Sequence, residues 1–123
     1  IYNSWPLMGS TYFPDDNKFI NLFNFSAFSD PSLMQFLHRN LAYVILGFYL
    51  IIMIKIYLNK LVCLYFAINL IGLFLVIQII LGIFTLLYGA QIFLASMHQI
   101  SSIFLVSSSV YFLYLNTNQQ LSN

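Results

Sequence analysis

The chain has 123 residues, of which 61% are hydrophobic and only 6% charged, with a formal net charge of +1. Its mean hydropathy of +0.88 indicates an integral membrane protein and excludes a water-soluble globule. No basic tract is present, so we expect the lipid bilayer and no nucleic acid as a partner. The predicted fold class is all-α, a polytopic membrane helix bundle.

Neither the single cysteine nor the N-terminal segment identifies the cellular compartment of the protein. Cys63 is the only cysteine, so no disulfide forms within the chain. The chain begins at Ile1 in a segment that resembles neither a signal peptide nor a presequence. We expect a fragment, a processed product or one piece of a split protein.

Residues 1–29 contain no apolar run long enough to span a bilayer, and Trp5-Pro6 and Pro14-Asp15 are turn signals. They are predicted to form an extramembrane loop. Within it, apolar residues of the segment 17–28 recur at roughly helical spacing. This segment is either a loop packed on the bundle or an amphipathic helix lying at the membrane interface.

Three membrane spans follow within the segment 30–116. Asp30 before Pro31 is a typical helix start, because Asp caps the first turn and proline is tolerated there. At about 1.5 Å per residue, a helix over 31–57 crosses the roughly 30 Å of hydrocarbon. Short breaks then separate two further predicted spans, 61–88 and 92–115, and residues 117–123 form a polar tail.

Short turns force successive spans to alternate in direction. Lys55 and Lys60 bracket the first turn, and the positive-inside rule places that turn on the cytoplasmic or matrix side. The N-terminal loop and the turn at Gly89 then lie together on the outer side.

A histidine lies at the same depth in the first and third spans. His38 and His98 each follow the start of a helix that enters from the outer side, about 9 Å below that start. Ionisable residues in the membrane are costly and usually functional. The leading interpretation is an iron bridged between the two imidazoles in a porphyrin; the alternatives are structural hydrogen bonding and a proton relay.

Small or polar residues near the histidines are consistent with a broad ligand, although small residues also let membrane helices pack closely. Gln78, Gly82 and Thr85 form one stripe of the second span, which we expect to face the bundle. The small residues near the two histidines are Ala42, Ala95, Ser101, Ser102 and Ser109.

Arg39 has two interpretations, a guanidinium that reaches lipid headgroups and one that binds a haem propionate. A zinc site is not expected, because zinc needs three or four ligands and Cys63 lies near the inner end of the second span, far from both histidines. The chain has no glutamate, and its aspartates lie in the outer loop, so paired-carboxylate catalysis is not expected either.

Four motifs in one order resemble the C-terminal half of the haem A synthase family, and they extend over nearly the whole chain. These motifs are Asn3-Ser4-Trp5-Pro6-Leu7-Met8, Gln35-Phe36-Leu37-His38-Arg39 with Ala42-Tyr43, the segment 78–87, and Leu94-Ala95-Ser96-Met97-His98-Gln99.

The resemblance implies two tandem four-helix bundles, with His38 and His98 as the axial ligands of a haem b cofactor in the C-terminal bundle. It also implies that the other bundle holds the haem O substrate and a glutamate three residues before its first histidine. Here Gln35 occupies that position. This bundle is therefore expected to bind the cofactor and to contribute no catalytic residue.

The resemblance also implies what this chain lacks, namely the first helix of its bundle and the whole N-terminal half. The expected function is the C-terminal portion of haem A synthase, an oxidoreductase of the mitochondrial inner membrane or bacterial plasma membrane that serves cytochrome c oxidase assembly. Alone, the chain is expected to be inactive. The alternatives are a cytochrome b-like electron carrier and a structural membrane subunit.

Overall fold

The computed structural model describes residues 2–121, and the only regular elements in that part of the chain are helices. The long helices are α1 (Pro31–Leu58), α2 (Tyr65–Leu87) and α3 (Ile92–Leu121), and the short 3-10 helices are η1 (Phe19–Phe23), η2 (Phe25–Phe28) and η3 (Val62–Leu64). Three helices are long and apolar enough to cross a membrane. The predicted all-α bundle with three spans is confirmed.

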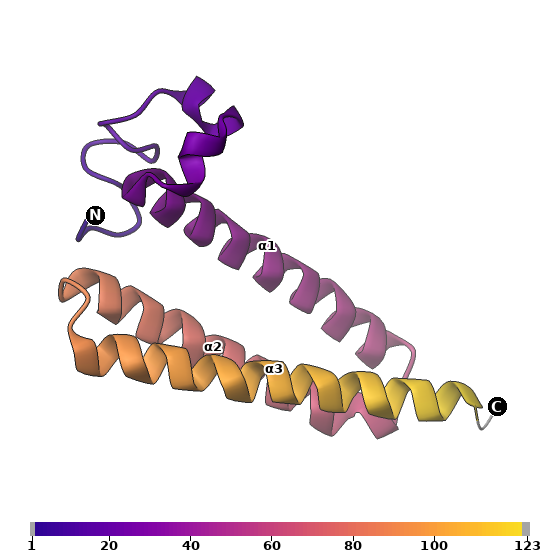
Figure 1. Ribbon diagram of the computed structural model, residues 1–123. Helices are drawn as coiled ribbons and strands as arrows, with labels where there is room; N and C mark the ends of the chain where they lie inside the picture. The colour runs from indigo at the N-terminus through magenta and orange to yellow at the C-terminus, as the bar shows by residue number, and fades with distance from the viewer. Residues whose placement is uncertain (1, 122–123) are drawn as a thin grey trace.

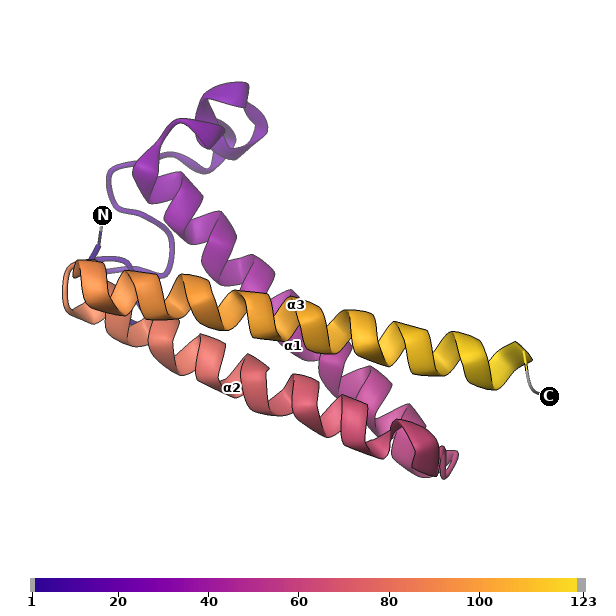
Figure 2. The ribbon, with the colours of Figure 1, turned by 60° about the horizontal axis from the view of Figure 1, so that its bottom comes forward.

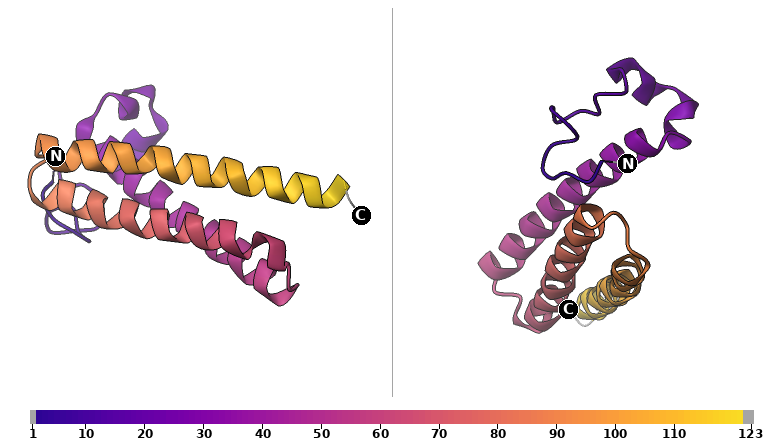
Figure 3. Two further views of the ribbon diagram at one scale, coloured as in Figure 1. Left: turned by 90° about the horizontal axis from the view of Figure 1, so that it is seen from below. Right: turned by 90° about the vertical axis from the view of Figure 1, so that its left-hand side faces the viewer.

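The three long helices form an open wedge (Figure 1). α2 and α3 run antiparallel and pack along their length, whereas α1 packs on α2 mainly at the end that holds the α1–α2 turn. Ile56, Leu64 and Ile68 form a buried core there. At the other end α1 diverges from the pair, as two further directions of view show (Figures 2 and 3).

At the helix ends, local hydrogen bonds pair backbone N–H and C=O groups that have no partner within the helix. The Asp30 carboxylate accepts the backbone N–H groups of Ser32 at 2.9 Å and Leu33 at 3.0 Å, which confirms the predicted helix start. At the end of α2, Gly89 has φ of 69° and its N–H bonds to Leu86 O, while Ala90 N–H bonds to Thr85 O. This pairing is a Schellman motif, which terminates a helix on a left-handed residue.

The α1–α2 turn has the same hydrogen-bond pattern, with a lysine in place of the glycine. Lys60 has φ of 53°, its N–H bonds to Tyr57 O, and Leu61 N–H bonds to Ile56 O. Both turns are therefore tight, and the outer loop and the α2–α3 turn lie at the same end of the molecule (Figure 1). The predicted alternation of direction is confirmed, and the side of the membrane stays a prediction.

Two helix boundaries differ from the predicted spans by more than one residue. α2 begins at Tyr65, because the 3-10 turn η3 precedes it. α3 continues to Leu121, where the sequence predicted an end at 115 and a polar tail. The polar residues 116–119 include no proline or glycine, and Cys63 Sγ lies 3.0 Å from Gln119 Oε1, which ties this turn to η3. Residues 122–123 of the predicted tail lie outside the described residues.

The segment 17–28 is not the single amphipathic helix considered from the sequence. It forms η1 and η2, separated at Asn24, whose extended backbone (φ −97°, ψ 145°) interrupts the helix. Phe19, Phe23 and Phe25 are 64%, 76% and 94% exposed. η2 nevertheless packs on α1 and buries Ala27 completely, so the segment is held on the bundle while these phenylalanines stay exposed. Its location at a membrane interface stays a prediction.

The first half of the outer loop folds around Asp15. Its carboxylate accepts the Ser10 N–H at 2.8 Å, the Ser10 hydroxyl at 3.0 Å and the Thr11 hydroxyl at 2.9 Å. The Ser10 backbone bond is the largest cause that lowers the pKa of Asp15 below its ordinary 3.8, followed by the hydroxyl of Thr11. Gly9, with φ of 81°, is required here, because a Cβ would overlap the Asp15 carboxylate.

We predict that acid loosens this half of the loop. A carboxyl whose pKa is lowered by folding stabilises the fold above its ordinary value of 3.8, and that contribution is lost as the pH falls through the lower folded value. The hydrogen-exchange protection of the Ser10 amide should therefore drop below pH 4. Asp15→Asn should abolish this pH dependence, and constant protection down to pH 2 would contradict the assignment.

A second prediction concerns the crossing of α1 and α2, where a Cβ on Gly72 would overlap the Tyr49 hydroxyl. Gly72→Ala should lower the free energy of unfolding by about 1–3 kcal/mol, the usual effect of overpacking. Thermal unfolding in detergent micelles measures it. Gly47→Ala is the matched control, because no atom of the described residues lies within 4 Å of its added Cβ. Equal effects of the two substitutions would contradict the predicted close contact.

Candidate functional site

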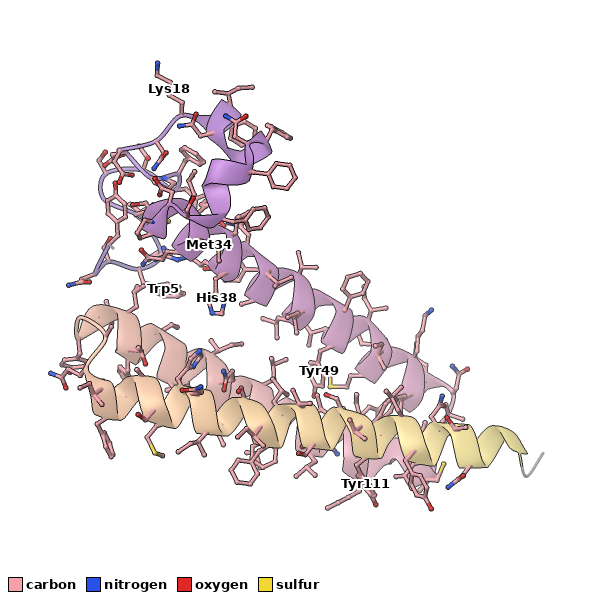
Figure 4. The ribbon with its side chains drawn as sticks, viewed as in Figure 1. Trp5, Lys18, Met34, His38, Tyr49 and Tyr111 are labelled. Atoms are coloured by element: carbon pink, nitrogen blue, oxygen red, sulfur yellow. The ribbon has the colours of Figure 1, made fainter. Side chains whose placement is uncertain are left out.

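A cavity of about 920 Å³ lies in the open end of the wedge, between α1, α2, α3 and the outer loop. Its volume is near the upper end of the roughly 300–1,000 Å³ typical of small-molecule and cofactor sites. His38 projects from α1 into this space (Figure 4). The walls include Trp5, His38, Arg39, Gln78, Gly82 and His98.

The structure brings together the two histidines that the sequence singled out. The ring centres of His38 on α1 and His98 on α3 are 6.3 Å apart, with an angle of 80° between the ring planes. Both rings line the cavity. Two imidazoles bound to one metal ion would have ring centres about 6 Å apart, because a metal–nitrogen bond is about 2 Å and the ring centre lies about 1 Å behind the nitrogen.

The ring of His98 is held against α2 by polar contacts. Gln78 Nε2 lies 3.3 Å from His98 Nε2, and the Ser101 hydroxyl forms a short hydrogen bond to Gln78 Oε1. A Cβ added to Gly82 would lie 3.0 Å from His98 Cε1. His98 Nδ1 is buried and has no hydrogen-bond partner among the described residues.

Arg39 holds the outer loop over the cavity. Its guanidinium donates to the carbonyl oxygens of Pro6 at 2.9 Å, Ser4 at 3.1 Å and Leu7 at 3.3 Å. The side chain is 8% exposed, so it does not reach out to lipid headgroups as one sequence interpretation had it. Arg39 also lines the cavity. Its contact with a propionate stays a prediction.

Gln35, which lies one helical turn before Arg39 on α1, also binds the outer loop. Its Oε1 accepts the Tyr2 N–H at 2.9 Å, and its Nε2 donates to the Tyr2 carbonyl at 2.8 Å. An amide side chain can make both bonds at once, whereas a carboxylate could only accept. Gln35 and Arg39 together position residues 2–8, including Trp5 of the cavity wall.

Sequence reasoning placed the histidines and missed part of their surroundings. It identified Gln78 and Gly82 as facing the bundle but did not foresee their contact with His98. Of the serines named from the sequence, only Ser101 contacts this group, because Ser102 bonds to Gln99 O and Ser109 lines a separate apolar cavity of about 330 Å³. Spacing along one helix cannot predict which partner a side chain meets on another helix.

Three apolar spans around a cavity lined by two neighbouring histidines define a multi-pass membrane protein with a candidate cofactor site. A sequence model for a family described as "Cytochrome oxidase assembly protein" matches residues 1–110. No solved structure matches the chain.

Bacterial proteins named "Heme A synthase" are similar over most of the chain. The protein of Pelagibacter ubique is 42% identical over 96% of the chain and 34% of its own length. That of Rickettsia prowazekii is 35% identical over 95% and 35%, and that of Wolbachia pipientis is 38% identical over 92% and 31%. The chain therefore belongs to the haem A synthase family, as its motifs predicted, and spans about a third of the length of these relatives.

We predict that Arg39→Gln releases the outer loop from the cavity. Removing hydrogen bonds from a charged group should lower the local stability of residues 4–7 by about 2–3 kcal/mol. Trp5 is the only tryptophan, so the fluorescence reports on this loop alone. Its emission maximum should shift to the red, and a soluble quencher should reach its indole ring more easily. Lys18→Gln, at the exposed tip of the loop, is the control. Unchanged emission in Arg39→Gln would contradict the role of Arg39.

Proposed function

We propose that this chain binds a haem b between His38 and His98 and serves as the C-terminal portion of a haem A synthase, which oxidises haem O to haem A. The observation that carries the proposal is the 6.3 Å separation of the two imidazole centres across a cavity. The structural alternative, a histidine pair that only bonds to neighbouring helices, would not require both rings to line a cavity of about 920 Å³.

The cavity walls suit a broad, apolar ring with an acidic edge. Most of the lining residues are apolar, and His38 on α1 and His98 on α3, which also line the cavity, would be the ligands. Arg39 places a cation at the outer end of the cavity, where a propionate would extend toward water. Haem supplies one-electron chemistry when it is bound.

The ligand set indicates the part that this chain has in the reaction. His38 and His98 would both hold the haem iron, and an iron held by two histidines would supply one-electron transfer and not oxygen binding. We therefore assign the chain an electron-transfer role, with no catalytic residue of its own. Oxidation of haem O would take place in the N-terminal half of the family's proteins, and the chain alone would be inactive.

The proposal also includes the membrane in which the protein lies and its protein partner. The named relatives are bacterial, which supports a bacterial plasma membrane as the site of a role in haem A biosynthesis. The N-terminal half of a haem A synthase would be the protein partner. A cytochrome b-like carrier would bind the same haem but would make no haem A when it is combined with that half.

We predict that His38→Ala and His98→Ala each abolish the low-spin b-type absorption of the haem-loaded chain, because each removes one axial ligand. Reduced-minus-oxidised optical spectra and a pyridine haemochrome assay measure the loss. Gln99→Ala is the control, since Gln99 is exposed and adjacent to His98. A normal low-spin spectrum in both histidine variants would refute the ligand assignment.

A further inference from the structure

We propose that Gln78 is a positioning residue that holds His98 Nε2 in the haem-free chain and competes with iron for that nitrogen. The inference rests on the proposed function for the identity of the metal. It starts from the contact between Gln78 Nε2 and His98 Nε2 at 3.3 Å, and from the hydrogen bond that Ser101 donates to Gln78 Oε1.

The direction of the hydrogen bonds follows from the orientation of the Gln78 amide, whose nitrogen faces His98 and whose oxygen faces the Ser101 hydroxyl, which also lies 2.9 Å from His98 O. An amide nitrogen is a donor only, so a ring nitrogen in contact with it must accept. Ser101 donates to Gln78, and Gln78 donates to His98 Nε2. The imidazole is then neutral, with its hydrogen on Nδ1.

The packing keeps the ring in this position. Ser101 is 7% exposed and lies on α3 within one turn of His98. Gly82 lies one turn from Gln78 on α2, and a Cβ there would meet His98 Cε1 at 3.0 Å and Nδ1 at 3.5 Å. The edge of the imidazole that carries both nitrogens therefore faces α2.

This arrangement differs from that of a residue that supports a metal ligand. A supporting residue accepts the hydrogen of the ring nitrogen that does not bind the metal. Gln78 instead donates to Nε2 and occupies the lone pair that a metal would use, while Nδ1 has no acceptor among the described residues. Binding of iron through Nε2 must break the contact with Gln78.

The hydrogen bond is tested first in the haem-free chain, by nitrogen-15 NMR of the His98 ring. The unsubstituted chain should show a neutral ring with its hydrogen on Nδ1, and Gln78→Leu should shift the Nε2 signal. Ser101→Ala, which leaves the Gln78 amide in place, should give a smaller shift. A ring with its hydrogen on Nε2 would overturn the proposal. Nitrogen-15 signals of His98 that are the same in both substituted chains as in the unsubstituted chain would overturn it too.

Competition with iron is tested by titrating the full chain in detergent with haem and following the low-spin absorption. Gln78→Leu should bind haem about tenfold more tightly, the equivalent of one hydrogen bond of about 1.4 kcal/mol that no longer has to be broken. Ser101→Ala should gain about two- to threefold, and it keeps the test usable if Gln78→Leu does not fold. Gln99→Leu, an exposed neighbour on α3, is the matched control.

The outcomes separate this inference from the proposed function. Unchanged or weaker haem binding in Gln78→Leu would overturn the competition and indicate that the amide supports the ligand. The absence of low-spin absorption in the unsubstituted chain would refute the proposed function and, with it, competition for iron. The NMR spectra would decide separately whether Gln78 holds His98 Nε2.

Discussion

The packing of α2 against α3 is the contact on which the rest of the structure depends. The two helices lie side by side along their length, and the Schellman motif at Gly89 joins them with a minimal turn. Because the pair is closely packed, Gln78 and Gly82 on α2 can reach the ring of His98 on α3. α1 is free to diverge, since it is fixed mainly at its inner end, and the cavity lies in the space that this divergence creates.

The outer loop completes the site through contacts with polar side chains of α1. A cation in a largely apolar helix is costly unless it is solvated. Three loop carbonyls solvate Arg39, and the amide of Gln35 pairs with the backbone of Tyr2. Through these bonds Gln35 and Arg39 bring Trp5 to the cavity wall.

The sequence predicted the parts of the fold that depend on local chemistry. Apolar length predicted the three helices, Asp30-Pro31 predicted the start of α1, and equal distances from two helix starts predicted that His38 and His98 would meet. It did not predict the divergence of α1, because that depends on which faces of different helices are complementary. The left-handed Lys60 and the role of Gln78 were also missed, since a left-handed lysine and a cross-helix amide contact have no signature in residue spacing.

The divergence of α1 also determines the route by which a ligand could reach the histidines. The outer loop covers the outer end of the cavity, and the core at Ile56, Leu64 and Ile68 closes the inner end of the wedge. α1 packs on α2 rather than on α3, so the side between α1 and α3 is the open one. The four-helix bundle that the resemblance implies has one more helix than this chain, and that helix would pack on this side, so a ligand would have to reach the histidines before the helix covers them.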